Sequence, residues 1–428
     1  MSSGRFDVLV VGGGASGMAA AITAKNENPE LSVAIVEKGE RMGRKLAITG
    51  NGRCNISNVE AFGAGEVRRF LESCGILLRQ DEDGRLYPCS EDAGQVAAFF
   101  AELAAGLGVE IFLNTEVKKV EACPEGGFLL LVEGPAAGGS PAEGKRGEQR
   151  EGAKELRAEK VVLATGGKSY PKTGSTGDGY VFARALGHKV SPLRPALVPV
   201  CVKPASGQGY SLKDLAGVRA KARVRLLEKG KELKSAKGEV QFREDSLSGI
   251  CVLEVSGFAL PHGSLGPEGY ADYEISIDFM PNMDEQKLAE HFEICGVNGH
   301  VLRTIVKGKL ARVLLAEARR ESGSQQLACE HIASQIADSE VMARVLKDFR
   351  LQVTGLKGWK EAQVTAGGVA ISEVDLVRME SKLVPGLFIT GEVLDFASGC
   401  GGYNLGLAWL TGSRAGWAAA GGYLESEE

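Results

Sequence analysis

The chain has 428 residues, 44% of them hydrophobic and 25% charged, which is the balance of a packed globular protein with room for two or three domains. A net charge of −5 argues against a nucleic-acid partner held by a strongly basic surface. The nine cysteines, scattered from Cys54 to Cys400, include no Cys-x-x-Cys pair and no zinc-ligand spacing. We therefore expect no disulfide framework, no metal site and a reducing, cytoplasmic location.

The N-terminal segment predicts a strand, a helix and a second strand. Residues 7–11 are an apolar run, residues 15–25 form a helical pattern of small residues, and residues 31–37 follow as a strand. Residues 8–24 look superficially like a signal peptide, but they are short and glycine-rich for a membrane span, so we expect no membrane partner. A βαβ unit places its strands in parallel, which predicts an α/β fold with a Rossmann-type domain.

The remaining elements divide the chain into three regions. Residues 134–155 are polar and aperiodic and predict a solvated surface insertion. Between residues 191 and 352 the character changes to mixed strands and helices, and the apolar strand pattern then resumes. The expected strands are 116–122, 128–132, 160–164, 220–227, 273–279 and 387–390, and the expected helices are 180–186, 284–294, 309–320, 327–337, 339–347 and 404–419.

A glycine motif, Gly12-x-Gly14-x-x-Gly17, lies between the first strand and the first helix, and Glu37 ends the second strand. In this context the glycines permit a tight turn, close approach of a pyrophosphate and close packing of the helix on the sheet. Glu37 is placed to accept hydrogen bonds from the adenosine ribose. The motif predicts a dinucleotide site but does not separate FAD from NAD.

Two later segments decide between the cofactors by resemblance. Residues 161–167, Val-Val-Leu-Ala-Thr-Gly-Gly, resemble the strand-ending Ala-Thr-Gly motif of two-dinucleotide-fold flavoproteins. Residues 386–392, Gly-Leu-Phe-Ile-Thr-Gly-Glu, resemble their C-terminal Gly-Asp motif, with Glu392 where the aspartate usually stands. The resemblance implies that FAD is the cofactor and that Glu392 binds its ribityl chain.

Three polar loops add candidate ligands. Residues 43–58 are rich in glycine, arginine and asparagine, which suits wrapping of a cofactor, although a flexible basic surface loop is the alternative. The glycine-rich residues 399–404 precede the last helix, whose N-terminus would face the flavin pyrimidine ring. Residues 173–179 precede another helix, where Asp178 is either a cofactor ligand or an N-cap.

Together these segments resemble one family over nearly the whole chain: bacterial flavoproteins that include 3-dehydro-bile-acid reductases and proteins labelled aminoacetone oxidases. The resemblance rests on residues 43–58, 164–180, 364–369, 379–382 and 391–404, although Arg378 stands where the family usually has threonine. It implies a two-dinucleotide-fold FAD-binding domain (1–190 and 353–428), an inserted β-rich domain (191–280 and 325–352), a helical domain (281–324) and noncovalent FAD. The predicted cofactor-binding residues are Gly12, Gly14, Ala15, Ser16, Gly17, Glu37, Lys38, Gly43, Arg44, Lys45, Leu46, Asn51, Gly52, Asn55, Val117, Ala164, Thr165, Gly166, Asp178, Gly391, Glu392, Gly402, Tyr403 and Asn404.

The function expected from this resemblance is hydride transfer through flavin N5 to a conjugated C=C bond of a hydrophobic oxo-substrate such as a 3-oxo bile acid. No second complete glycine motif is present, so NAD(P)H would dock transiently as reductant. Tyr403 is the candidate proton donor, and Arg53 or Lys45 would polarise the carbonyl, although stacking of Tyr403 and phosphate binding by Arg53 are alternatives. An amine oxidase that uses oxygen, or a flavin-dependent RNA-modifying or redox-sensing protein, are the other hypotheses.

Cysteine and histidine side chains are two further candidate catalytic groups. Cys54 and Cys400 lie in predicted flavin loops, but without a close pair they are interpreted as incidental thiols. His188 follows a predicted helix, where a histidine typically contacts the helix C-terminal carbonyls, and it is not assigned a catalytic role.

Overall fold

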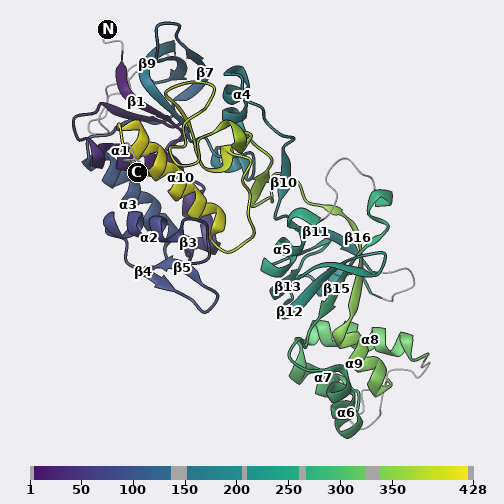
Figure 1. Ribbon diagram of the computed structural model, residues 1–428. Coiled ribbons are helices and arrows are strands. Elements are labelled where there is room, and N and C mark those ends of the chain that lie inside the picture. Colours follow the sequence, from purple (N-terminus) through teal and green to yellow (C-terminus); the bar gives the residue numbers. More distant parts are fainter. Residues whose placement is uncertain (1–3, 136–151, 205–209, 260–266, 324–336, 423–428) are drawn as a thin grey trace, which may run out of the picture. The chain divides into compact units, whose positions relative to one another are not determined.

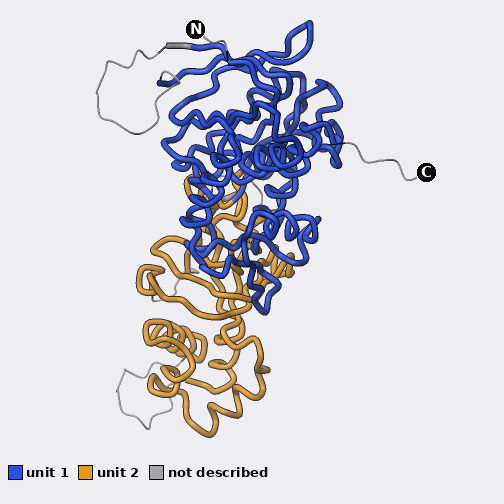
Figure 2. Tube along the Cα trace, turned by 90° about the vertical axis from the view of Figure 1, so that its left-hand side faces the viewer, with its two compact units in different colours: residues 1–194, 364–428 blue, residues 195–363 orange. Residues whose placement is uncertain are grey.

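The computed structural model describes residues 4–135, 152–204, 210–259, 267–323 and 337–422. The chain forms two compact units, residues 1–194 with 364–428 and residues 195–363 (Figure 2). The sequence analysis placed the corresponding boundaries at 190/191 and 352/353. Both crossings are marked by short strands, β10 (Arg194–Ala196) and β17 (Val364–Ala366).

The first unit is built on a seven-stranded sheet with the order β6-β2-β1-β9-β8-β7, in which β18 also pairs with β9 (Figure 1). Strands β6, β2, β1, β9 and β18 pair in parallel, and β8 and β7 extend the sheet in antiparallel orientation. This confirms the predicted α/β Rossmann-type core. The strands are β1 (Arg5–Val11), β2 (Val33–Val36), β6 (Glu110–Phe112), β7 (Glu116–Ala122), β8 (Phe128–Gly134), β9 (Gly152–Leu163) and β18 (Leu387–Ile389).

Strand β9 is longer than its apolar pattern indicated. Its first half pairs with β8, from Gly134↔Gly152 to Phe128↔Ala158, and its end pairs with β18 along the same edge. The predicted surface insertion 134–155 is therefore wrong at its C-terminal end, because residues 152–155 are strand. From Glu155 to Ala158, exposed polar residues alternate with buried apolar ones, as expected of an antiparallel strand pair with one solvated face. Residues 136–151 lie outside the described residues.

Helices and a small sheet complete the first unit. A three-stranded sheet has the order β3-β5-β4. Its strands are β3 (Ser57–Asn58), β4 (Leu78–Gln80) and β5 (Arg85–Pro88), and the helices are α1 (Ala15–Glu27), α2 (Ala64–Ser73), α3 (Ala93–Gly106), α4 (Asp178–Ala185) and α10 (Tyr403–Ala419). The aromatic core between α2, α3 and α10 contains Trp409, whose ring centroid lies 4.6 Å from that of Phe100.

The helices α1 and α10 cross closely because the contact surface consists of small residues. A Cβ atom on Gly416 would lie 2.2 Å from the carbonyl oxygen of Ala20, and one on Gly412 would lie 2.2 Å from that of Ser16. Backbones can approach this closely only without side chains at the crossing. The C-terminal helix is thereby fixed against the helix that follows the glycine motif.

The second unit contains a closed barrel, with the order β11-β14-β13-β12-β15-β16, and helices that were expected as a separate group. The barrel strands are β11 (Val200–Lys203), β12 (Arg219–Glu228), β13 (Lys231–Phe242), β14 (Ser246–Ser248), β15 (Tyr273–Asp278) and β16 (Phe349–Leu356), and the helices are α5 (Ile250–Ala259), α6 (Glu285–Cys295), α7 (Gly299–Ile305), α8 (Gly308–Glu321) and α9 (Ser339–Lys347). Helix α9 packs against α6 and α8, although the sequence analysis assigned its range to the β-rich domain. The expected helix 327–337 lies almost wholly outside the described residues.

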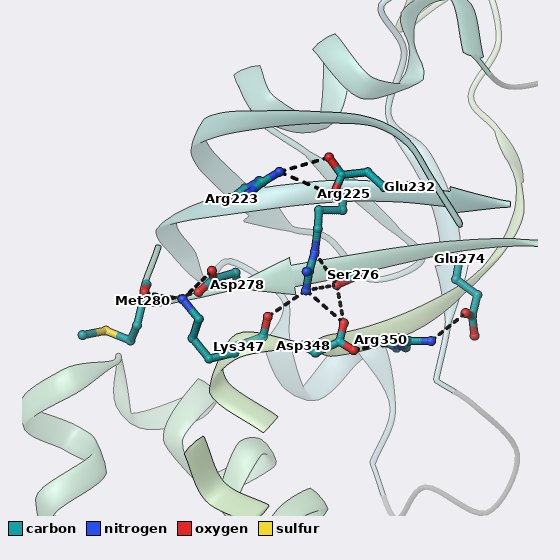
Figure 3. A network of polar contacts seen from close by, with 10 residues as sticks. All are labelled: Arg223, Arg225, Glu232, Glu274, Ser276, Asp278, Met280, Lys347, Asp348 and Arg350. Atoms are coloured by element: carbon teal, nitrogen blue, oxygen red, sulfur yellow. Dashed lines mark hydrogen bonds and ion pairs between the residues drawn. The ribbon is translucent and has the colours of Figure 1, made fainter. Parts of the chain in front are cut away.

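A polar network ties the end of α9 to the outer face of the barrel (Figure 3). Arg225 donates to Ser276 Oγ at 2.7 Å, to Asp348 Oδ1 at 3.1 Å and to the Lys347 carbonyl at 2.9 Å. Arg350 pairs with Asp348 at 2.8 Å. Burial alone would raise the pKa of Asp348, but hydrogen bonds from Arg350 and Ser276 and the nearby positive charges hold it below its ordinary value.

Within the described residues, no helix is both long enough and apolar enough to cross a membrane.

The helix crossing gives a stability prediction. We expect Gly416→Ala to lower the melting temperature, since its Cβ must displace the backbone of α1, with a loss of about 1–3 kcal/mol for overpacking. Gly106→Ala is the matched control, because Gly106 ends α3 with nothing within 4 Å of its added Cβ, and alanine favours helix. Equal melting temperatures of the two variants by calorimetry would contradict the close crossing.

Candidate functional site

The candidate site begins where three parallel strands end side by side. The N–H of Ala164 donates to the Val11 carbonyl at 2.9 Å, and the N–H of Thr390 donates to the Leu163 carbonyl at 3.1 Å. These contacts align the ends of β1, β9 and β18. Ligands of open α/β sheets bind outside the carboxyl ends of the strands, so this edge is the expected cofactor position.

The glycine motif forms an anion cradle at the start of α1. A Cβ on Gly17 would lie 1.9 Å from the Gly12 carbonyl oxygen, and one on Gly12 would lie 2.6 Å from the Ala164 carbonyl oxygen. Gly14 is the N-cap of α1, has no side-chain cap, and nothing lies within 4 Å of an added Cβ. The first helical turn, which includes the predicted ligands Ala15 and Ser16, thus has no side-chain cap and open space beside its N-cap, which fits a pyrophosphate.

Glu37 lies beside this cradle at the end of β2. Its Oε2 accepts from the Gly13 N–H at 2.8 Å, and its Oε1 accepts from the Gly39 N–H at 2.7 Å. These bonds fix the carboxylate at the sheet edge and leave each oxygen a further acceptor position. Binding of the ribose by Glu37 stays a prediction.

An ion pair links the residue after Glu37 to the start of helix α4. Lys38 forms an ion pair with Asp178 and also bonds the Thr176 hydroxyl. Asp178 is the first residue of α4, and the N-cap is Gly177 in a left-handed conformation with φ of 91°. The N-cap interpretation of Asp178 is therefore wrong, because its carboxylate pairs with Lys38 across the site.

The partly buried carboxylate of Glu392 joins four segments of the chain, which are three loops and the strand β17. Its Oε2 receives the Lys45 ammonium at 2.9 Å, and its Oε1 accepts from the Ser169 hydroxyl at 2.8 Å and from the Thr365 N–H at 2.6 Å. Lys45 also donates to Ser169 Oγ at 2.6 Å. The four segments are those that carry the flavoprotein-like motifs, so the sequence segments singled out separately meet at one side chain.

The charge of Glu392 is maintained by its partners. Burial alone would raise the pKa of this carboxyl, but the positive charge of Lys45 and the hydrogen bonds from Lys45, Ser169 and Thr365 hold the pKa below its ordinary value of 4.5. In these contacts Glu392 binds the protein itself. Binding of the ribityl chain by Glu392 stays a prediction. The ribityl hydroxyl groups would have to share this carboxylate with Lys45, Ser169 and the Thr365 N–H.

Helix α10 presents its N-terminus beside the loop 43–58. Its N-cap, Gly402, has φ of 94° and no side-chain cap. Asn58 donates to the Gly401 carbonyl at 3.0 Å, and the Asn55 amide, in the orientation that satisfies both neighbours, accepts from the Gly402 N–H at 3.1 Å. Asn404 donates to the carbonyls of residues 398 and 399 at 3.0 Å, which fixes the glycine loop. These contacts leave the first turn of α10 positioned as an electrostatic partner for a flavin ring.

The structure places the other predicted cofactor ligands as follows. Gly43 donates to the Gly13 carbonyl at 2.8 Å, which ties the polar loop to the glycine motif, and Arg44 donates to the Lys172 carbonyl at 2.8 Å. Asn51 has a left-handed φ of 56°. Leu46 and Val117 are buried, Asn51 and Gly52 are exposed, Thr165 and Gly166 follow β9, Gly391 follows β18, and Tyr403 is the first residue of α10.

The predicted catalytic cations are both engaged with carboxylates. Lys45 binds Glu392 as described, and Arg53 donates to Glu91 Oε2 at 2.5 Å and lies over the Tyr87 ring. Neither partner was foreseen, because each is far away in sequence. The thiol of Cys54 is buried, and burial raises its pKa to about 11, which supports the interpretation as an inert thiol.

A buried histidine cluster escaped the sequence analysis. His188 Nδ1 lies 3.1 Å from Glu373, and its Nε2 lies 2.8 Å from Ser381 Oγ. The expected contact of its ring with helix carbonyls is therefore wrong. Ser381 Oγ also accepts from the N–H groups of Leu383 and Val384, so its lone pairs hold the backbone turn. The cluster joins the end of α4 to the 373–384 segment rather than forming a nucleophile.

The Glu392 contacts predict a pH-dependent stability. Because its pKa is lower in the folded chain, the carboxylate stabilises the fold above pH 4.5 and loses this contribution as the pH falls through the folded-state pKa. We expect Glu392→Gln to lower the melting temperature at neutral pH, since Lys45 loses its counter-charge, and to flatten the acid side of the profile. Glu159→Gln, which removes an exposed ion pair, is the control. A profile for Glu392→Gln parallel to that of the unchanged protein would refute this role.

Comparisons with known proteins identify the family of this chain. A family model described as HI0933-like protein Rossmann domain matches residues 6–63 and 57–418. The chain is 32% identical to 3-dehydro-bile acid delta(4,6)-reductase from Clostridium scindens, covering 96% of this chain and 98% of that protein. It is 28% identical to ribosomal RNA dihydrouridine synthase from Escherichia coli, covering 97% of each. A solved 3-ketosteroid-delta4-(5alpha)-dehydrogenase from Rhodococcus jostii RHA1 aligns over 97% of each chain with a TM-score of 0.48 and 16% identity.

The resemblance that the motifs indicated is confirmed over nearly the whole chain. The cradle at α1, the acid after β2 and the uncapped N-terminus of α10 fit a flavin dinucleotide. This chain belongs to the HI0933-like FAD-binding Rossmann family of flavin oxidoreductases.

Proposed function

We propose that this protein reduces a C=C bond conjugated to a carbonyl group in a small hydrophobic oxo-substrate such as a 3-oxo bile acid, with NAD(P)H as the electron donor. The observation that carries the proposal is the similarity over the whole chain to two relatives whose names denote the same chemical change. A delta(4,6)-reductase and a dihydrouridine synthase both add two hydrogens across a C=C bond that is conjugated to a carbonyl. FAD, when bound, supplies the hydride for such a reaction.

Side chains of the protein would supply a proton to the substrate and polarise its carbonyl group. Tyr403 begins α10 beside the glycine loop, and its phenol is the candidate donor to the carbon that does not receive hydride. The ammonium of Lys45 carries three N–H groups, two of which are used by Glu392 and Ser169. The third has no partner among the described residues and is available to a substrate carbonyl oxygen. Glu392 and Ser169 orient this lysine.

The RNA relatives make a reductase of uridine in ribosomal RNA the second candidate. Electrostatics supports the small-molecule substrate instead. The net charge is −5, and the cations drawn on the barrel in Figure 3 are matched by carboxylates: Arg223 by Glu232, Arg225 by Asp348 and Lys347 by Asp278. A guanidinium that already has a carboxylate partner gains less from a phosphate and releases fewer counterions.

Anaerobic reoxidation of the reduced holoenzyme tests the proposal. We expect flavin absorbance to return quickly after addition of an oxo-steroid dienone and slowly after addition of oxygen or of a uridine-containing ribosomal RNA transcript. Tyr403→Phe should slow the dienone reaction by about 10²-fold or more, the typical contribution of a general acid, while FAD content is retained.

Lys172→Gln is the control for these rates, because this lysine contributes only its backbone carbonyl to the contact with Arg44. Rapid reoxidation by the RNA transcript with no dienone turnover would establish the RNA substrate. Rapid oxygen consumption with an amine substrate and no turnover of either alkene would contradict both reductase hypotheses. Loss of FAD from Tyr403→Phe would make Tyr403 a cofactor ligand.

A further inference from the structure

Two arginines from different segments of the chain lie over the same aromatic ring, that of Tyr87. The guanidinium of Arg53 lies 4.7 Å from the Tyr87 ring centroid, and that of Arg79 lies 5.8 Å from it. Glu91 bridges them, since its Oε2 accepts from Arg53 Nε and its Oε1 pairs with Arg79 Nη2. Arg53 follows the 46–52 turn, Arg79 lies in β4, and Tyr87 lies opposite Arg79 in β5.

This cluster has excess positive charge that is open to solvent. Two guanidinium groups share one carboxylate, and the side chains of Arg53 and Arg79 are 51% and 45% exposed. Arg53 uses only Nε for Glu91, so its two Nη groups have no partner among the described residues. Planar donors of this kind are the preferred partners of carboxylate and phosphate oxygens, which they bind through two parallel hydrogen bonds.

The cluster is also held rigidly. Stacking on Tyr87 and the shared carboxylate restrict both arginines before any ligand arrives. Glu91 adopts a left-handed φ of 48°, an unfavourable conformation for a residue with a side chain. The fold therefore accepts backbone strain at the residue that positions the two arginines, as is common at binding sites.

The backbone of Arg53 lies near the N-terminus of α10. Asn55 accepts a hydrogen bond from the N–H of Gly402, the N-cap residue of this helix. Arg53 is two residues before Asn55, and two residues of extended chain span at most about 7 Å. A substrate whose reacting carbonyl lies beside Tyr403 thus has Arg53 within the length of a small polycyclic molecule.

We propose that Arg53 and Arg79 form a binding site for an oxyanion of the substrate, a carboxylate or a phosphate, remote from the reacting C=C bond. This rests on the proposed function, since it names the substrate as an amphipathic anion with its charged end at the arginine cluster. Arg53 then binds the charged group of the substrate and does not polarise its carbonyl group. Lys45 is the residue that polarises the carbonyl.

Equilibrium binding to the oxidised holoenzyme tests the site without turnover. By titration calorimetry, cholate is compared with methyl cholate, and uridine 5′-monophosphate with uridine, so that each anion has a neutral counterpart. We expect at least one anion to bind about ten-fold or more tightly than its counterpart, and this preference to fall about ten-fold in Arg79→Gln and in Arg53→Gln. The anion with the stronger preference identifies carboxylate or phosphate as the source.

Arg85→Gln is the matched control, because Arg85 lies in the same small sheet but pairs with Asp81 and Asp83. It should keep the full anion preference, and all variants should keep their FAD absorbance. Equal affinity for charged and neutral ligands in the unchanged protein, or an unchanged preference in both arginine variants, would overturn the proposal. Anion preference without dienone turnover would refute the proposed reaction and leave this site standing, whereas dienone turnover without anion preference would do the opposite.

Discussion

The architecture of the site depends on one charge, largely shielded from solvent, that must be matched: the carboxylate of Glu392, whose side chain is 21% exposed. A carboxylate removed from water is costly unless it is paired and hydrogen-bonded, and Glu392 meets this requirement through Lys45, Ser169 and the Thr365 N–H. Each donor comes from a different segment: Lys45 and Ser169 from two loops, and Thr365 from the strand β17. The same contacts that satisfy the charge therefore fix the relative positions of these segments at the ends of β9 and β18. Loosening any of them leaves a partly buried charge with too few partners.

The sequence predicted the backbone of the site better than its side-chain contacts. The motif Gly12-x-Gly14-x-x-Gly17 is local, and its requirements follow from a turn and a helix that are themselves local, so its geometry was predictable. The parallel core and the helix at 404–419 also follow from the hydrophobic pattern, whereas the close crossing of α10 on α1 was not predicted. Of the residues predicted as cofactor ligands, Gly12, Glu37 and Ala164 directly follow β1, β2 and β9, and Gly391 lies two residues after β18.

What the sequence could not provide was the choice of partner. Glu392 and Lys45 are far apart in the chain, as are Arg53 and Glu91, and nothing in spacing or periodicity links them. The extension of β9 was missed for a related reason, because its pairing with β8 is a long-range contact made by a polar segment. His188 shows the same limit, since a single histidine carries no signal for Glu373 and Ser381.

The family and the geometry make separate contributions to the functional account. Family membership shows a flavin oxidoreductase of the FAD-binding Rossmann type, whereas the described contacts show which partners hold the individual side chains. Lys45 is held by a carboxylate that orients it, and Arg53 is held by one that leaves most of its N–H groups outward. Two cations that the sequence analysis treated as equivalent are thus distinguished by their partners.

The central claim is that Glu392 binds the protein and orients Lys45, and a crystal structure of the FAD complex tests it most directly. The account predicts pyrophosphate oxygens against the N–H groups of the first turn of α1, with the Glu392 contacts to Lys45, Ser169 and the Thr365 N–H retained. Ribityl hydroxyls bonded to Glu392, with Lys45 displaced from it, would contradict the claim.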